Sequence, residues 1–325
     1  MFEGLLANVL ILLASIIILD KASDWTVANS VRVAQISGFG KTAVGFMLMA
    51  FATSLPELSV SIFAAIGQES IGVAIGNALG SNIVDVCLIL GLCFIMAALK
   101  NPDCTALIPA MSKEDLGSLY FGLFVASIIP LTLLYIGYAS RFIGVVLLAI
   151  FILYIYQRSK LRNVKEKDGL GGGKEKLGKY VSLTVLGAGL VVAGSYFIVD
   201  SASYLAESVG IPKVVIGATI VAFGTSIPEL ATSLDAVRKG HLDLALGNIV
   251  GSCFVNITCI LGIALAASTL TVNMAAFSAL VTFTLITNLL LWYFLSSEKI
   301  GWKEGAVLLF MYFIFLTSSF GGKEK

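Results

Sequence analysis

A nine-residue stretch that occurs twice sets the plan of this chain. The copies are AFATSLPEL at residues 50–58 and AFGTSIPEL at residues 222–230, and seven of nine positions are identical. Each copy places one glutamate, two hydroxyl groups and one proline inside a long apolar segment. A carboxylate in the hydrocarbon core of a membrane is costly, so it persists only where it has partners or a function. The duplicated stretch therefore predicts a functional site around Glu57 and Glu229.

The apolar segments around these copies indicate the class of protein. Hydrophobic residues make up 58% of the 325 residues and charged residues only 13%. Several apolar runs reach the roughly 20 residues that a membrane-spanning helix needs. We therefore expect an all-α polytopic membrane protein with ten transmembrane helices. The predicted spans are 4–20, 42–67, 70–99, 117–137, 141–157, 180–199, 213–237, 243–267, 274–295 and 303–320, and the amphipathic stretch 21–41 is expected to extend the first helix along the surface.

A second duplicated motif divides the chain into two halves. It reads GNALGSNIVD at residues 76–85 and GNIVGSCFVN at residues 247–256. The distance from Glu57 to Asp85 is 28 residues and that from Glu229 to Asn256 is 27. With five spans per half, the second half must run opposite to the first, which is the inverted repeat of many secondary transporters. The predicted parts are a first half at 1–157, a basic, glycine-containing hinge loop at 158–179 and an inverted second half at 180–325.

The basic residues predict the orientation of the chain. If the loop at 158–179 is cytoplasmic, 17 of the 21 Lys and Arg residues lie on that side of the membrane. Four lie outside, namely Arg141, Lys213, Lys323 and Lys325. Cytoplasmic loops carry an excess of Lys and Arg. We therefore expect a multi-pass protein of the cell membrane with both termini outside, surrounded by lipid.

The prolines of the first motif predict broken helices. Pro56 and Pro228 have no N–H group and clash with the carbonyl four residues earlier, so each helix should kink or unwind at residues 50–56 and 222–228. Irregular backbone at membrane depth is tolerated around a cavity or a ligand. A hydroxyl residue stands four positions before each polar end of a motif, as Ser81 stands before Asp85, which places the two side chains on one helix face. The glycines at 76, 80, 247 and 251 should allow close helix packing.

The polar groups of the four motifs favour a hard cation as ligand. They are carboxylates, hydroxyls, one amide and backbone carbonyls, and they include no His, Cys, Lys or Arg. Ca²⁺ and Na⁺ take such oxygen-rich sites, whereas softer metals prefer nitrogen or sulfur. The alternative is that these groups only hydrogen-bond the helices together. Two pairs of motifs in register favour the ion site over that alternative.

These motifs resemble the α-repeats of the cation/calcium exchanger superfamily, most closely the compact prokaryotic members of its sodium/calcium exchanger branch. The similarity covers residues 40–100 and 212–267 and the ten-span plan. It implies an antiporter rather than an enzyme, with alternating access by movement of spans 1 and 6 and with no organic cofactor. It also implies four cation positions at mid-membrane. The ligands implied for Ca²⁺ are Glu57, Glu229, Thr53 and Thr225; those implied for Na⁺ are the carbonyls of Ala50 and Ala222 with Ser54, Ser81, Ser226 and Ser252; Asp85 and Asn256 complete the central positions.

Two features of this chain depart from the symmetry of that pattern. Ala52 stands where the second copy has Gly224, which should stiffen the first helix. The central pair is unequal, with Asp85 in the first half and Asn256 in the second. Three carboxylates, Glu57, Asp85 and Glu229, can give the empty site a charge of up to −3. Such a charge is hard to occlude in a low-dielectric interior, so we expect exchange of ions rather than leak and a proton on Asp85 when Ca²⁺ is bound.

Other functions fit the sequence less well. A Ca²⁺/H⁺ exchanger of the same superfamily typically has a glutamate shortly after its Gly-Asn pair, and here the pairs are followed by Ala-Leu-Gly-Ser and Ile-Val-Gly-Ser instead. A K⁺-dependent exchanger remains an alternative. A channel is a further alternative, although broken helices and a charged site fit an occluded ion better than an open pore. An intramembrane carboxylate protease would need a Gly-x-Gly-Asp motif, which the chain lacks. The net charge of +1 gives no indication of nucleic acid, His241 is expected in a solvated loop, and the five cysteines have no metal-site spacing.

Overall fold

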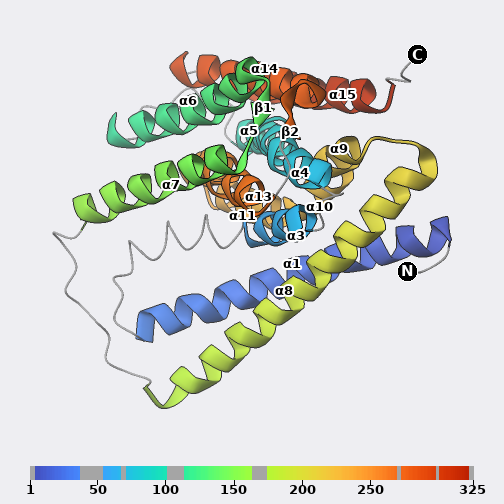
Figure 1. Ribbon diagram of the computed structural model, residues 1–325. Coiled ribbons are helices and arrows are strands. Elements are labelled where there is room, and N and C mark those ends of the chain that lie inside the picture. Colours follow the sequence, from blue (N-terminus) through green and yellow to red (C-terminus); the bar gives the residue numbers. More distant parts are fainter. Residues whose placement is uncertain are drawn as a thin grey trace.

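The computed structural model describes residues 4–36, 54–66, 71–100, 113–162, 174–268, 272–297 and 300–321. These residues form helices almost throughout (Figure 1). In chain order they are α1 (Leu5–Ile36), α3 (Leu55–Ile66), α4 (Ile71–Ile83), η1 (Val84–Ile89), α5 (Leu90–Lys100), α6 (Lys113–Ile136), α7 (Arg141–Arg162), α8 (Lys174–Val209), α9 (Lys213–Ile216), η3 (Gly217–Val221), α10 (Ala222–Thr225), α11 (Ile227–Arg238), α12 (Leu242–Val255), η4 (Asn256–Ile260), α13 (Leu261–Ala267), η5 (Met274–Phe277), α14 (Ser278–Ser296) and α15 (Trp302–Gly321). The segments η1, η3 and η4 are π-helical and η5 is a 3₁₀-helix.

The lengths of these helices confirm an all-α membrane protein. Five described stretches are long and apolar enough to cross a membrane, or six if the bent pair Lys213–Thr225 and Ile227–Arg238 counts as one span. Three shorter apolar helices, Leu5–Leu19, Leu55–Ile66 and Arg141–Tyr156, lie in other predicted spans, and α8 covers the sixth. Of the predicted span 42–67, only residues 54–66 are described. The number of ten spans stays a prediction.

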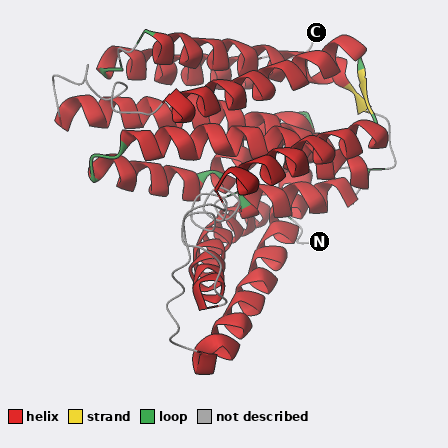
Figure 2. Ribbon diagram, turned by 90° about the vertical axis from the view of Figure 1, so that its left-hand side faces the viewer, coloured by secondary structure: helices red, strands yellow, loops and turns green. Residues whose placement is uncertain are grey.

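The described helices form two groups. The long helices α1 and α8 pack against each other as a crossing pair, and the remaining helices form a bundle on one side of that pair (Figures 1 and 2). The pair meets the bundle mainly where α8 contacts α3 and α9. At Gly224 a Cβ atom would lie 2.6 Å from Cδ1 of Ile16 on α1, so a larger residue would require the Ile16 side chain to shift. The pair therefore contacts α3 and α10, the two segments that carry parts of the first motif.

The second copy of the first motif sits at a broken helix, as the proline predicts. α10 ends at Thr225, Ser226 leaves the helical conformation with ψ of 9°, and α11 begins at Ile227 with Pro228 in its first turn. The helix axis bends by 46° at this break. Pro228 is tolerated there because the first N–H groups of a helix have no intrahelical acceptor. In the first copy α3 likewise begins at Leu55, directly before Pro56; of the predicted break at 50–56, residues 50–53 lie outside the described residues.

The helices of the second motif contain π-helical turns that the sequence did not predict. The helix from Ile71 to Lys100 is interrupted by η1, which begins at Val84, and the helix from Leu242 to Ala267 by η4, which begins at Asn256. Both turns thus start within one residue of the central polar positions Asp85 and Asn256. A π-turn inserts an extra residue and is frequent at functional sites. The third π-helical segment, η3, ends at Val221, directly before the second copy of the first motif.

Glycines of the second motif bring α4 close to the helix that contains η3. A Cβ atom on Gly80 would overlap the backbone of Ala218, and one on Gly76 would overlap the carbonyl of Val214. Gly217 faces the other way and fits against the backbone of Val73, where a Cβ would lie 2.6 Å from the carbonyl oxygen. These contacts confirm the predicted role of Gly76 and Gly80. The same role for the glycines at 247 and 251 stays a prediction.

Contacts between distant segments show which helix ends share a face of the protein. The strands β1 (Tyr138–Ala139) and β2 (Val272–Asn273) pair antiparallel, and Nε of Arg141 donates to the Ser268 carbonyl, 3.1 Å away, at the same end. Nζ of Lys100 donates to the carbonyl of Arg238. These pairs agree with the predicted grouping of helix ends. The assignment of the cytoplasmic face rests on the basic residues.

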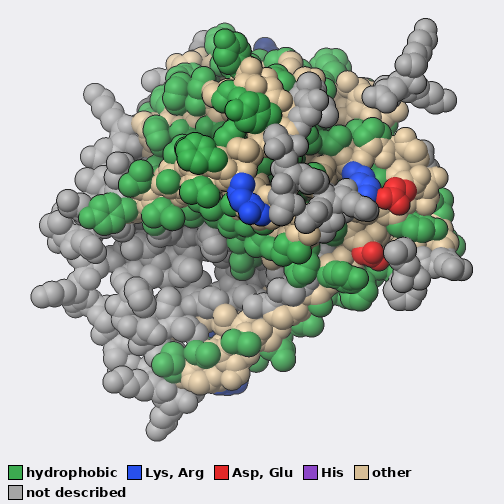
Figure 3. Space-filling model, in the orientation of Figure 1, with side chains coloured by type: hydrophobic (Ala, Val, Ile, Leu, Met, Phe, Trp, Pro, Cys, Tyr) green, Lys and Arg blue, Asp and Glu red, His purple; other side chains and the backbone are tan. Residues whose placement is uncertain are grey.

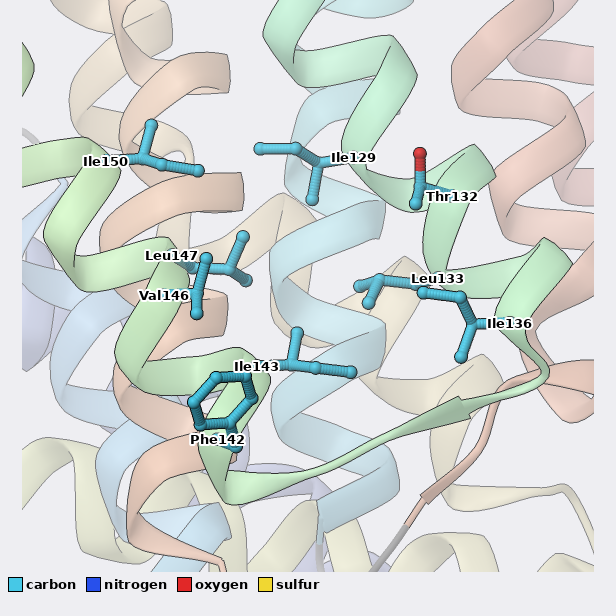
Figure 4. Close-up of a pocket in the computed structure, with 9 residues that line it drawn as sticks. All are labelled: Ile129, Thr132, Leu133, Ile136, Phe142, Ile143, Val146, Leu147 and Ile150. Carbon is cyan, nitrogen blue, oxygen red and sulfur yellow. The ribbon is translucent and has the colours of Figure 1, made fainter.

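The outer surface of the bundle is apolar, as lipid contact requires. Figure 3 shows a face on which hydrophobic side chains dominate and few charged ones appear. An open groove of about 290 Å³ lies between α6 and α7 (Figure 4). Its lining is apolar apart from Thr132 and contains none of the candidate ligands; the residues are Ile129, Thr132, Leu133, Ile136, Phe142, Ile143, Val146, Leu147 and Ile150.

The hinge loop is shorter than predicted at its ends. α7 continues to Arg162 and α8 begins at Lys174, so both helices enter the range 158–179. Lys, Arg and Glu are good helix formers, which explains why charged ends extend the helices. Residues 163–173, with the glycine run, lie outside the described residues, and the hinge role stays a prediction.

Three smaller predictions concern α1, the histidine and the cysteines. The extension of the first helix is confirmed as far as Ile36, where the description of this segment ends. His241 is exposed directly before α12, as expected of a loop residue. The four described cysteines are free and buried in apolar helices, and they are Cys87, Cys93, Cys253 and Cys259.

Candidate functional site

Each motif glutamate is buried and is reached by a serine from the other half of the chain. Glu57 and Glu229 are 1% and 0% exposed. The Ser226 hydroxyl donates to Oε1 of Glu57 at 3.2 Å, and the Ser54 hydroxyl donates to Oε1 of Glu229 at 3.4 Å. Because the two contacts are reciprocal, the two copies of the motif meet face to face in the core.

The starts of α3 and α11 explain why these carboxylates can lie there. Glu57 is in the first turn of α3 and Glu229 in the first turn of α11. The free N–H groups of a first turn carry a partial positive charge that favours a carboxylate. A continuous helix at the same place would offer no such groups. In the second half, the irregular backbone at Ser226 and the new helix start at Ile227 thus lie directly beside Pro228 and Glu229.

Asp85 lies next to this pair. Its carboxylate is fully buried beside that of Glu57, with the hydroxyls of Ser226 and Ser252 nearby. Neither oxygen of Asp85 has a hydrogen-bond partner among the described residues. The hydroxyls of Ser54 and Ser252 lie 3.3 Å apart, which ties the second motif to the first. Buried carboxylates close to each other repel when both are ionised, so this arrangement favours a bound cation or proton.

The remaining candidate ligands fall into three groups. Ser81 and Asn256 are fully buried, and Oγ of Ser81 and Oδ1 of Asn256 have no hydrogen-bond partner in the part of the chain that is described. The carbonyl of Ala222, also buried, accepts the Ser226 N–H at 3.0 Å and the Thr225 hydroxyl at 3.3 Å. Ala50 and Thr53 lie outside the described residues. Ala52, the residue expected to stiffen the first helix, also lies outside them.

Asparagine side chains form a second layer that the sequence analysis missed. Nδ2 of Asn77 donates to the Glu57 carbonyl and to the Ser61 hydroxyl, both at 3.2 Å. Oδ1 of Asn77 accepts the Thr225 hydroxyl at 3.1 Å. Asn77 thus links the helix of Glu57 to the Thr225 segment of the other half. The signal was the asparagine of each Gly-Asn pair, since in the second half Asn248 donates to Ser233 at 3.1 Å.

The chemistry of this cluster is that of neutral and acidic oxygens. The buried polar side chains of the described residues include no Lys, Arg or His. The same residues contain no group of three or more His, Cys, Asp and Glu that could hold a metal ion. Hydroxyls, carbonyls and an amide would therefore have to complete any cation site around the carboxylates. Such a mixed oxygen set suits Ca²⁺ or Na⁺.

Comparison with known protein families agrees with this geometry. The family model described as "Sodium/calcium exchanger protein" matches residues 7–160 and 179–321, which is nearly the whole chain. The chain belongs to the sodium/calcium exchanger family. It is therefore a membrane transporter of a cation exchanger family rather than a member of an enzyme family, and the predicted resemblance is confirmed.

Individual relatives show the same similarity along the chain. An uncharacterized membrane protein of Methanocaldococcus jannaschii is 34% identical over 311 residues, which cover 94% of this chain and 96% of that protein. The sodium/calcium exchanger MaX1 of Methanosarcina acetivorans is 42% identical over 94 residues, or 29% of this chain and 27% of MaX1. A structure of the sodium-calcium exchanger NCX_Mj soaked with 10 mM Na⁺ and no Ca²⁺ has a TM-score of 0.65 and 29% identity, and the match covers 97% of this chain and 99% of NCX_Mj.

Proposed function

We propose that this exchanger moves Na⁺ against Ca²⁺ by alternating access, with both ions bound between the two motif pairs. The observation that carries the proposal is the reciprocal contact of Ser226 with Glu57 and of Ser54 with Glu229. It brings two carboxylates, one from each half, to a single buried place. Family membership and the similarity to NCX_Mj and MaX1 support the choice of ions.

The charge of the site explains why transport would be coupled. Glu57, Glu229 and Asp85 are all buried, so the empty, ionised site would carry up to three negative charges away from water. Burying unpaired charge costs several kcal/mol per ion. The protein can therefore switch its open side only with cations bound. Three Na⁺ neutralise the full charge, and one Ca²⁺ neutralises it when one carboxylate is protonated.

The ligands divide by charge. Ca²⁺ would lie between Glu57 and Glu229 with the oxygens of Thr53 and Thr225, because a divalent ion gains most from two carboxylates. Na⁺ would use neutral oxygens, namely those of Ala50, Ser54, Ser81, Ala222, Ser226 and Ser252. Asp85 and Asn256 would complete the centre. The orphaned oxygens of Asp85, Ser81 and Asn256 are available for this purpose.

The proposed architecture is ten spans in two inverted halves with a hinge at 158–179. It is supported by matching elements, since α3, η1 and α6 in the first half have counterparts α11, η4 and α14 in the second. The helices α1 and α8 pack mainly against each other on one side of the bundle (Figure 2), which supports the proposal that this pair moves and opens the site to alternate sides. Both termini would then lie outside.

Calcium uptake into vesicles tests the proposal. Purified protein in lipid vesicles should accumulate radioactive Ca²⁺ under an outward Na⁺ gradient, and much less under an equal K⁺ or H⁺ gradient. The vesicles without protein and a Glu57→Gln protein serve as controls. Uptake driven by H⁺ alone would replace the proposal with a Ca²⁺/H⁺ exchanger, and uptake without any gradient dependence would favour a channel.

A further inference from the structure

Asn82 is a buried amide with both ends of its side chain occupied. It follows Ser81 on α4 and is fully buried. Its Nδ2 donates to the backbone carbonyl of Cys253 at 3.4 Å. Its Oδ1 accepts a hydrogen bond from Nδ2 of Asn256 at 3.1 Å. The two contacts fix the Asn82 amide between the motif helices of the two halves.

The contact with Asn256 decides which end of that amide faces the site. A side-chain amide has a donor end and an acceptor end, and rotation by 180° exchanges them. Because Nδ2 of Asn256 is held by Asn82, Oδ1 of Asn256 is the free end, and it has no hydrogen-bond partner among the described residues. A buried acceptor without a partner is destabilising, because it has lost its hydrogen bonds to water. A cation at this place would remove that cost.

The first half lacks an equivalent arrangement. The position of Asn82 in the second motif is taken by Cys253, whose thiol is fully buried near Asp85. A thiol is a weak hydrogen-bonding group compared with an amide. The hydroxyls of Ser226 and Ser252 lie near the Asp85 carboxylate, and none of its hydrogen bonds comes from a side-chain amide like the one that holds Asn256. A carboxylate needs no such orientation, because both of its ends are acceptors.

We propose that Asn82 is a positioning residue that turns the Asn256 amide so that its oxygen faces the bound cation. This inference rests on the proposed function and extends it, since it adds a residue that touches no ion. Residues behind metal ligands commonly act this way, and changing them lowers metal affinity by about 10- to 100-fold. The ion concerned is Na⁺, because a neutral amide adds more to a monovalent site than to one with two carboxylates.

Thermal stabilisation by Na⁺ in detergent measures the effect without transport. A ligand that binds only the folded protein raises its melting temperature with concentration, which gives the half-saturating concentration. Asn82→Ala should raise that concentration for Na⁺ about tenfold. Asn82→Cys introduces the residue of the second motif and leaves a smaller void than alanine. It should also raise the half-saturating Na⁺ concentration, and it replaces the alanine variant if that variant is poorly folded. Asn288→Ala is the control, because Asn288 is a buried amide whose Nδ2 donates to Ser127 on α6 rather than to a motif residue.

The decisive comparison uses the Asn256→Ala background. If Asn82 acts only through Asn256, the double variant Asn82→Ala with Asn256→Ala should bind Na⁺ as Asn256→Ala does, because the two effects do not add. An additional loss equal to that of Asn82→Ala alone would overturn the inference, as would unchanged Na⁺ affinity in Asn82→Ala and Asn82→Cys. Absence of Na⁺ stabilisation in the unmodified protein would instead contradict the cation site as a whole.

Discussion

Asp85 and Asn256 occupy the same position in the two halves, but their surroundings differ. Each lies at the start of a π-helical turn, four residues after a buried serine. Asn256 is held by Asn82, whereas both oxygens of Asp85 have no hydrogen-bond partner among the described residues. The glutamates show the opposite pattern, since Glu57 and Glu229 have equivalent serine partners across the interface.

This difference shows that the central positions of a duplicated site can differ while the two glutamates keep equivalent partners. The two glutamates have equivalent serine partners, as expected if the proposed divalent ion between them takes one carboxylate from each half. An aspartate at position 256 would raise the number of buried carboxylates in this cluster from three to four. Replacing one acid by an amide keeps the shape and removes a charge, and Asn82 then supplies the orientation that the amide needs. The predictions below test the equal pair first and then the unequal one.

The largest effect is expected at the equal pair. Glu57→Gln or Glu229→Gln should each abolish Na⁺-driven Ca²⁺ uptake, because both carboxylates replace the hydration shell of the ion. A glutamine of the same size should leave the fold intact, which size-exclusion chromatography and the melting temperature can check. Normal calcium flux in either variant would exclude the assignment of the Ca²⁺ position.

A smaller effect is expected at the unequal pair. If Asp85 carries a proton when Ca²⁺ is bound, Asp85→Asn has nearly the same shape and hydrogen-bonding groups. Its Na⁺-driven uptake should then stay within about tenfold of the unmodified protein, a difference of 1.4 kcal/mol. The measurement uses the same Na⁺ gradient and matched amounts of protein. Loss of uptake as complete as in Glu57→Gln would mean that Asp85 is an ionised ligand.

The third test concerns the orientation of the two halves in the membrane. It uses cysteine labels that are not expected to change transport. Single cysteines at Glu3 and Gly322 should react with a membrane-impermeant thiol reagent in intact cells, and one at Gly172 only after permeabilisation. The reason is the distribution of Lys and Arg. These three positions lie outside the described residues. The unmodified protein is the control for its own cysteines, and a Gly172 label that reacts in intact cells would reverse the orientation.

Much of the fold could be predicted because the residues of each segment largely determine whether it forms a membrane helix. Long apolar runs, the proline at 228 and the glycines at 76 and 80 act through the backbone of their own segment. The break before Pro228 and the close approach at Gly80 accordingly appear where the sequence indicates. The ends of α7 and α8 were missed because charged residues can continue a helix into water.

The sequence by itself indicated which residues are candidates for the site, and the tertiary structure decided how the described ones among them meet. Two buried glutamates, the serines beside them and the unequal central pair follow from the repeated motifs. The exchange of serine partners between Glu57 and Glu229, the π-helical turns and the amide layer of Asn77 and Asn82 do not. Each of these joins segments about 150 to 175 residues apart or depends on the register of one helix against another. The direction in which a side-chain amide points is set by the partner that packing brings to it, and that partner lies in the other half of the chain.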